Sequence, residues 1–84
     1  MPRLSFDEAL NNHPNDILDA LDNPNSFARC QTLALLIGRR ASSPAFIDKA
    51  RSMTDDLGAA PFGKTVGDVA KMYLEAVSTW AECG

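Results

Sequence analysis

One stretch of the chain has the residue types and spacing of a phosphate-binding loop. Residues 58–65 read GAAPFGKT, which satisfies the pattern G-x-x-x-x-G-K-S/T. In such a loop the backbone amides hold phosphate groups, the lysine contacts phosphate oxygens, and the threonine hydroxyl helps to hold magnesium. The loop needs a buried strand before it and a helix after it, because these aim the amides at the phosphates.

The neighbouring residues supply only half of that setting. Thr65 and Asp68 are spaced as a capping box, which predicts that a helix begins directly after the loop. The ten residues before Gly58, DKARSMTDDL, are charged and helical in pattern, so no buried strand leads into the loop. We therefore interpret 58–65 as a connection in which Phe62 packs into the core. An incidental anion site at the amides near Thr65, beside Lys64, is the alternative left open.

No other residues have a spacing typical of catalysis or metal binding. His13 is the single histidine, and it precedes a proline, which is typical of a turn. Cys30 falls in an apolar segment, where we expect it to pack as a small hydrophobic residue. The serines have no base with the spacing of a catalytic triad. We expect no catalytic, cofactor-binding or metal-binding residue and therefore no enzyme.

The charges divide the chain into three segments. Residues 1–25 carry one base and five acids, residues 26–54 carry five bases and one acid, and residues 55–84 carry two bases and five acids, for a net charge of −3. The favoured interpretation is mutual attraction between neighbouring helices. The alternative is an anion-binding or nucleic-acid-binding patch in the basic segment. Its candidate residues are Arg39, Arg40, Lys49 and Arg51.

Length and composition restrict the class of protein. Eighty-four residues suffice for one domain, and 45% of them are hydrophobic, which is enough to fill a small core. The longest apolar run, residues 33–37, is far shorter than a membrane span, and the first ten residues do not read as a secretory signal. Two cysteines are too few for a disulfide framework. These features predict a soluble cytoplasmic protein without membrane association.

Helix start and stop signals recur along the chain. Ser5 and Glu8 are spaced as a capping box, Ser43 precedes a proline, and Gly38 is expected to end the third helix in the left-handed conformation. No segment alternates with a period of two residues, so no sheet is expected. The fold class predicted is all-α, a compact five-helix bundle or a short helical stack. The expected helices run from about 6 to 11, from 14 to 21, from 26 to 37, from 44 to 53 and from 65 to 81 or 82.

Two of these helices have informative faces. The third is apolar on nearly all sides, which predicts a central position with burial all round. The last places its apolar residues on one arc of roughly 160°, at 100° per residue, and only Met72 lies outside that arc.

The helical layout resembles the HEAT-like repeat proteins over residues 14–81. Residues 16–25, DILDALDNPN, look like a repeat helix that ends in leucine before an Asp-Pro type of turn. Residues 43–50 and 69–77 look like helices of the following units. The 54–64 linker is longer than an inter-repeat turn, and two partial units are fewer than an open solenoid needs. The resemblance implies a module that binds macromolecules.

The sequence therefore predicts a small protein–protein interaction module that binds through a helical face. A self-complementary dimer is one form of it, and a mobile-element or phage inhibitor that docks on a host complex is another. Anion or nucleic-acid binding through the basic segment is the alternative. It is less favoured because the sequence pI is about 4.8 and no aromatic residue is interleaved with the bases.

Overall fold

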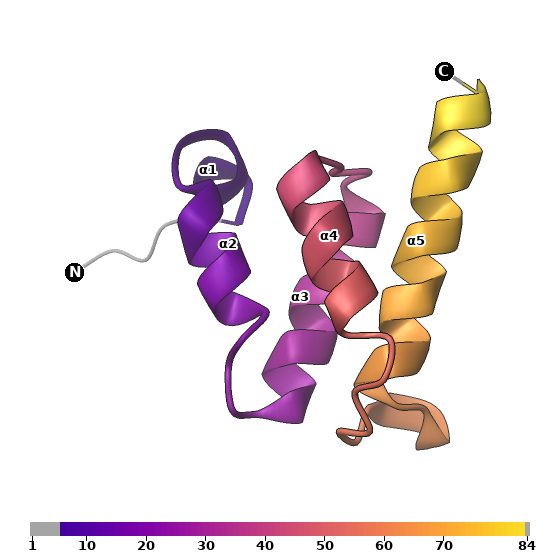
Figure 1. The fold of residues 1–84 in the computed structure, drawn as a ribbon. Helices are drawn as coiled ribbons and strands as arrows, with labels where there is room; N and C mark the ends of the chain where they lie inside the picture. The colour runs from indigo at the N-terminus through magenta and orange to yellow at the C-terminus, as the bar shows by residue number, and fades with distance from the viewer. Residues whose placement is uncertain (1–5, 84) are drawn as a thin grey trace.

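The computed structural model describes residues 6–83. Within this range it has α1 (Phe6–Asn12), α2 (Pro14–Ala20), α3 (Ser26–Gly38), α4 (Pro44–Ser52) and α5 (Val66–Cys83), with the short 3-10 helix η1 (Pro61–Gly63) before α5 (Figure 1). These residues contain no strand and only an isolated bridge between Ala59 and Thr65. The predicted all-α class and the five helices are confirmed.

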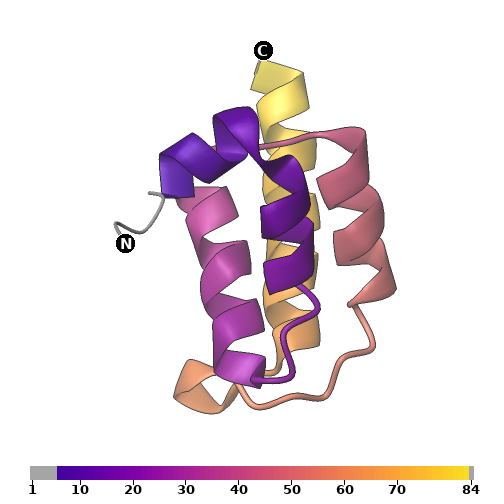
Figure 2. The ribbon, with the colours of Figure 1, turned by 90° about the vertical axis from the view of Figure 1, so that its left-hand side faces the viewer.

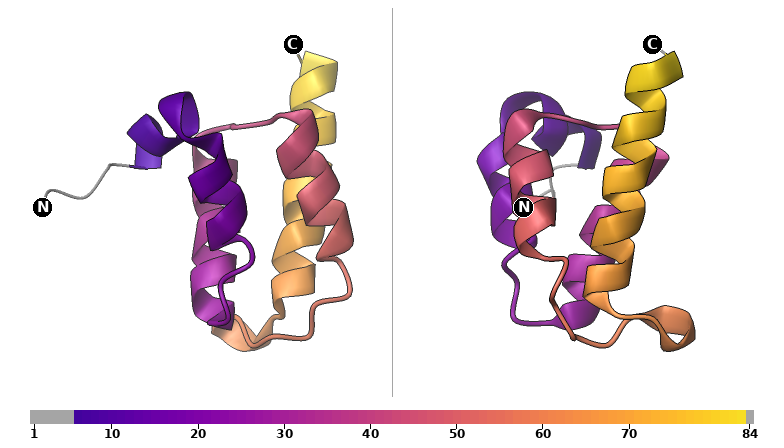
Figure 3. Two further views of the ribbon diagram at one scale, coloured as in Figure 1. Left: turned by 60° about the vertical axis from the view of Figure 1, so that its left-hand side comes forward. Right: turned by 45° about the vertical axis from the view of Figure 1, so that its right-hand side comes forward.

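The helices form three layers. Figure 2 shows α2 in front of α3 and α4, with α5 behind them, and α1 across one end. α3 and α5 begin at the same end and run in the same direction, while α4 runs the opposite way between them in the chain (Figures 1 and 3). The connection from α4 to α5 passes around the end where α3 and α5 begin, and it places η1 there (Figure 3).

The helix starts follow local capping chemistry. The Asn25 side chain accepts a hydrogen bond from the Phe27 amide at the start of α3, and the Ser43 hydroxyl accepts one from the Phe46 amide at the start of α4. At α5 the two bonds of a capping box are both present. The Asp68 amide donates to the Thr65 hydroxyl, and the Thr65 amide donates to the Asp68 carboxylate. The capping box predicted at Ser5 lies outside the described residues.

The end of α3 differs from the prediction. Gly38 remains helical, and the left-handed residue is Arg40, with a φ of 51°. The Arg40 amide donates to the Ile37 carbonyl, and the Ala41 amide donates to the Leu36 carbonyl at 2.9 Å. These are the two bonds of a Schellman motif, which sets the left-handed position by the carbonyls it must satisfy and not by the residue type. The helix therefore includes the glycine as its last residue.

One apolar cluster holds the layers together. Its largest fully buried side chains come from the α2 end, from α3 and from α5: Leu21, Leu33, Leu36, Val66 and Tyr73. Toward its C-terminus, α5 extends beyond its neighbours (Figure 1), and its later apolar residues Val77 and Trp80 are only half-buried. No helix among the described residues is both long enough and apolar enough to cross a membrane.

The burial predicted on all sides of α3 is wrong on one side. α3 packs against α2 and α5, but Phe27, Gln31 and Ala34 remain exposed. The sequence could not show this, because the covered sides of α3 depend on how the other helices pack against it. Within the described residues, no sixth helix covers this side of α3.

Candidate functional site

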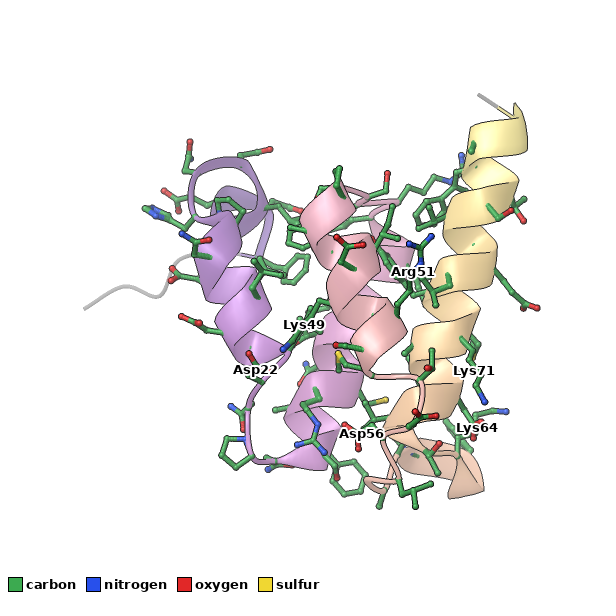
Figure 4. The ribbon with its side chains drawn as sticks, viewed as in Figure 1. Asp22, Lys49, Arg51, Asp56, Lys64 and Lys71 are labelled. Atoms are coloured by element: carbon green, nitrogen blue, oxygen red, sulfur yellow. The ribbon has the colours of Figure 1, made fainter. Side chains whose placement is uncertain are left out.

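The four predicted binding residues do not form one patch. Arg39 pairs with Asp7 of α1, and Lys49 pairs with Asp22 at the end of α2. The Arg51 and Asp48 side chains on α4 approach to 3.7 Å. Figure 4 shows Lys49 on the side of α4 that faces α2 and Arg51 on the other side of that helix. The two residues lie two positions apart, and such positions face away from each other on a helix.

A fifth basic side chain has a structural partner as well. The Arg29 guanidinium donates from Nε and Nη2 to the two oxygens of Asp56, at 2.9 and 3.2 Å, and from Nη1 to the Asn23 carbonyl. The Asp56 carboxylate also accepts the Gly58 amide at 2.8 Å, and this bond, together with Arg29, lowers the pKa of Asp56. These contacts join the α2–α3 turn to the loop before α5. A Cβ at Gly58 would lie 2.7 Å from the Cβ of Ser26, which cannot rotate away, so this close approach requires glycine.

A polar cavity of about 440 Å³ lies beside this network, between the ends of α2 and α4. Its charged lining residues include both partners of the Asp22–Lys49 and Arg29–Asp56 pairs, so most of its charge is already compensated. No group of three or more histidine, cysteine or acidic residues within the described part of the chain is arranged to hold a metal ion.

The amides at the end of the phosphate-loop pattern and at the start of the helix that follows it are occupied by the chain itself. The Val66 amide donates to the Gly58 carbonyl and the Gly67 amide to the Asp56 carbonyl, each at 2.9 Å. The capping box uses the amides of Thr65 and Asp68. A phosphate cradle would need these same donors at the start of the helix to be available. The arrangement is that of a loop closing onto a helix.

Phe62 is not in the core, contrary to the prediction. Its side chain is 98% exposed, and its backbone is left-handed, with a φ of 64°. The bridge between Ala59 and Thr65 and the Ala60 amide bond to the Lys64 carbonyl, at 2.9 Å, close the loop beneath it. Because the loop is held at both ends by backbone bonds, it presents Phe62 at its tip.

An apolar groove of about 380 Å³ runs along the exposed side of α3, between α3 and α5, and reaches η1. We call it the α3–α5 groove. Its lining residues are Cys30, Ala34, Ile37, Pro61, Phe62, Lys64, Val69 and Met72. Met72 is 48% exposed. Burial raises the pKa of the Cys30 thiol, as expected for a cysteine packed as a hydrophobic residue.

Sequence reasoning missed this groove, although one signal indicated it. Met72 was the one apolar residue outside the buried arc of the last helix. A large apolar residue on the polar side of a helix favours a surface that faces something other than the core.

Comparison of the chain with protein-family models, with curated proteins and with solved structures finds no match in any of the three.

Proposed function

We propose that this protein is a small, non-enzymatic interaction module that binds a protein partner through the α3–α5 groove and the adjoining loop tip. The observation that carries the proposal is Phe62. A bulky residue in left-handed backbone costs free energy, and a fully exposed aromatic ring contributes nothing to the core. An aromatic side chain held in this way is suited to anchor a partner.

The groove beside Phe62 supports the same proposal. Its walls are apolar apart from Lys64, and they continue the apolar surface of α3. Apolar side chains gathered around a groove are typical of protein-binding sites. The resemblance of residues 14–81 to HEAT-like proteins, most of which bind macromolecules, favours this class of function too.

Binding of an anion or nucleic acid through the basic segment is the weaker proposal. Arg39, Lys49 and Arg51 each lie against a carboxylate, which cancels much of their attraction for phosphate. Arg40 is exposed, but one cation does not make a patch.

The test is affinity capture from lysate of the source cells, with identification of the bound protein. Wild type is compared with Phe62→Asn, because asparagine tolerates left-handed backbone and should keep the loop intact. Leu57→Ser is the matched control, since Leu57 is 85% exposed on the same α4–α5 connection but does not line the groove. We expect Phe62→Asn to lose a partner that Leu57→Ser retains, with both variants melting close to wild type.

A partner retained by Phe62→Asn, or lost equally by both variants, would contradict the proposal. The comparison is then repeated by calorimetry with the purified variants and the purified partner. This excludes indirect capture through a third protein.

A further inference from the structure

The residues beside the groove indicate which partner it fits. We propose that the α3–α5 groove is covered by the same groove of a second copy of this chain, with the two α5 helices antiparallel across a two-fold axis. This inference rests on the proposed function and names the partner.

The exposed bulky apolar side chains gather on the face that carries the groove. Phe62 and Met72 line the groove, and Phe27 lies on the exposed side of α3. Of the four large apolar residues exposed among residues 6–83, only Leu57 is outside this set. The exposed residues of α3 form one row with spacings of four, three and four positions, and none of them is charged: Phe27, Gln31, Ala34 and Gly38. Such a face on so short a chain favours burial against another protein.

A row of charges borders the groove on the α5 side. Its members are also spaced by four, three and four positions, so they lie along one side of α5 and of the turn before it: Lys64, Asp68, Lys71 and Glu75. We call this row the charge stripe. Figure 4 shows its two lysines on the same side of the start of α5. The Thr65 amide chiefly lowers the pKa of Asp68, and the positive charges of Lys71 and Lys64 lower it further, because these groups lie close together.

The charge stripe runs directly beside the apolar wall of the groove. Met72 follows Asp68 by four positions and precedes Glu75 by three, so it is a neighbour of both on the helix surface. The Asp68 carboxylate accepts the Thr65 amide but keeps its charge. No ion pair among the described residues involves any member of the stripe. A partner seated on the groove therefore meets four unpaired charges along one edge.

The order of signs in the charge stripe favours a second copy as that partner. Along the chain the signs are plus, minus, plus and minus, so the stripe has no net charge and selects neither an acidic nor a basic partner. In reverse the signs are minus, plus, minus and plus. When two copies meet with antiparallel α5 helices, each Lys64 therefore faces Glu75 of the second copy, and each Lys71 faces Asp68 of the second copy.

The antiparallel arrangement also suits the rest of the face. α3 and α5 run in the same direction, so the same axis sets the two α3 helices antiparallel (Figure 3). Ala34 and Gly38 are small and exposed, which lets these two helices approach closely. Phe62 belongs to η1, at the end where α5 begins, so the axis places one Phe62 at each end of the interface. An axis parallel to the helices would instead set the charge stripe against the uncharged side of α3 and leave it unpaired.

The first test is the mass of the full-length chain in solution as a function of concentration. Light scattering after size exclusion, from about 1 to 300 µM, should show the mass rise from the 9.1 kDa of one chain to twice that value. Met72→Lys places a charge in the apolar interface and should weaken self-association at least about tenfold. Arg51→Glu reverses a charge on α4 outside the groove, so it is the matched control and should leave self-association unchanged.

An exchange of charges tests the antiparallel pairing itself. Lys64→Glu and Glu75→Lys should each weaken self-association about three- to tenfold, because each variant makes two like-charged contacts across the axis. The chain that carries both substitutions restores the two attractions and should dimerise as wild type does. An equimolar mixture of the two single variants should form a mixed dimer in preference to either homodimer, since opposite charges then meet. Circular dichroism checks that each variant is folded.

The outcomes separate this inference from the proposed function. A chain that remains at 9.1 kDa at every concentration overturns the second copy, and so does a dimer that Met72→Lys leaves intact. A dimer that is lost on Met72→Lys but does not respond to the charge exchange overturns the antiparallel pairing. If the chain is monomeric while lysate capture of another protein still depends on Phe62, the proposed function stands and the groove belongs to a different partner.

Discussion

Tyr73 is the largest fully buried side chain, and its hydroxyl is a polar group at the edge of the core. The hydroxyl donates a hydrogen bond to the Ala41 carbonyl at 2.7 Å, just beyond the end of α3. Its ring meets Trp80 edge-on, with 6.3 Å between ring centroids. One residue therefore ties α5 to the α3–α4 connection, and burial raises the pKa of Tyr73 to about 12.

This pKa predicts a loss of stability at high pH. Because the pKa of Tyr73 is about 12 in the folded chain and near 10 when unfolded, the folded state holds the proton more tightly. The stabilisation is complete below pH 10 and is lost between about pH 10 and 12, by at most ~1.4 kcal/mol per pH unit. Urea unfolding from pH 8 to 11.5 measures it. Tyr73→Phe should cost about 1 kcal/mol at pH 8 and flatten the alkaline loss; an unchanged slope would contradict the assignment to Tyr73.

The exposure of the Phe62 side chain could not be predicted from its residue type. Burial is a good default for phenylalanine, and no neighbour in sequence signals the opposite. The position of its side chain depends on the backbone bonds that close the loop from Ala59 to Thr65, and the type of residue 62 does not reveal these bonds. Met72 was more informative, because helical periodicity alone separated it from the buried arc.

At the end of α3, the glycine and the residue with left-handed backbone are at different positions. Gly38 is helical and a Cβ there would meet nothing within 4 Å, while Arg40 has the left-handed backbone that glycine prefers. Both choices cost stability, since glycine weakens a helix and a Cβ crowds the left-handed conformation. The end of α3 is therefore not optimised for stability.

Substitutions at these two positions should both stabilise the fold, although they exchange glycine in opposite senses. Gly38→Ala should stabilise by up to about 1 kcal/mol, and Arg40→Gly by a similar amount. Gly63→Ala is the matched control, because Gly63 also has open space but has a φ of 74°, so alanine there should destabilise by about 1 kcal/mol. Each kcal/mol corresponds to a melting shift of about 4–8 °C. A stabilising Gly63→Ala would refute the conformational explanation.

The elements themselves were predictable because their signals are local. A cap needs only a side chain and an amide two or three residues away, and Asn25, Ser43 and Thr65 supply these within a few residues. The groove was not predictable in this way. It depends on α3 and α5 lying side by side with nothing against their open side, and this is a property of the docked helices.

At the scale of the molecule, the charge segments join the layers. Three ion pairs connect the basic middle to the acidic ends: Arg39–Asp7, Lys49–Asp22 and Arg29–Asp56. The favoured interpretation of the charge pattern, attraction between neighbouring helices, agrees with this geometry. Sequence could give the signs of the segments but not the partner of each base, because the partners of these three lie 27 or 32 residues away.

The hydrogen bonds that Asp56 and Asp68 accept from backbone amides predict how the whole fold responds to acid. The pKa of Asp56 is lowered chiefly by the Gly58 amide, and the pKa of Asp68 chiefly by the Thr65 amide. The folded state therefore binds protons less readily than the unfolded chain, whose aspartates titrate near 3.8. The stabilisation from both groups is present above about pH 5 and is lost as the pH falls through the lower folded values.

Thermal melts from pH 7 to pH 2 test this response, with Asp56→Asn as the informative variant. Asparagine cannot replace the charge that Arg29 faces, so the variant should lose about 1–2 kcal/mol at pH 7. It should also lose less stability on acidification than wild type, because one of the two titrating groups is gone. Asp16→Asn is the control, since Asp16 is exposed on α2, and it should follow wild type at every pH. Parallel acid curves for Asp56→Asn and wild type would show that the Arg29–Asp56–Gly58 network does not couple folding to protonation.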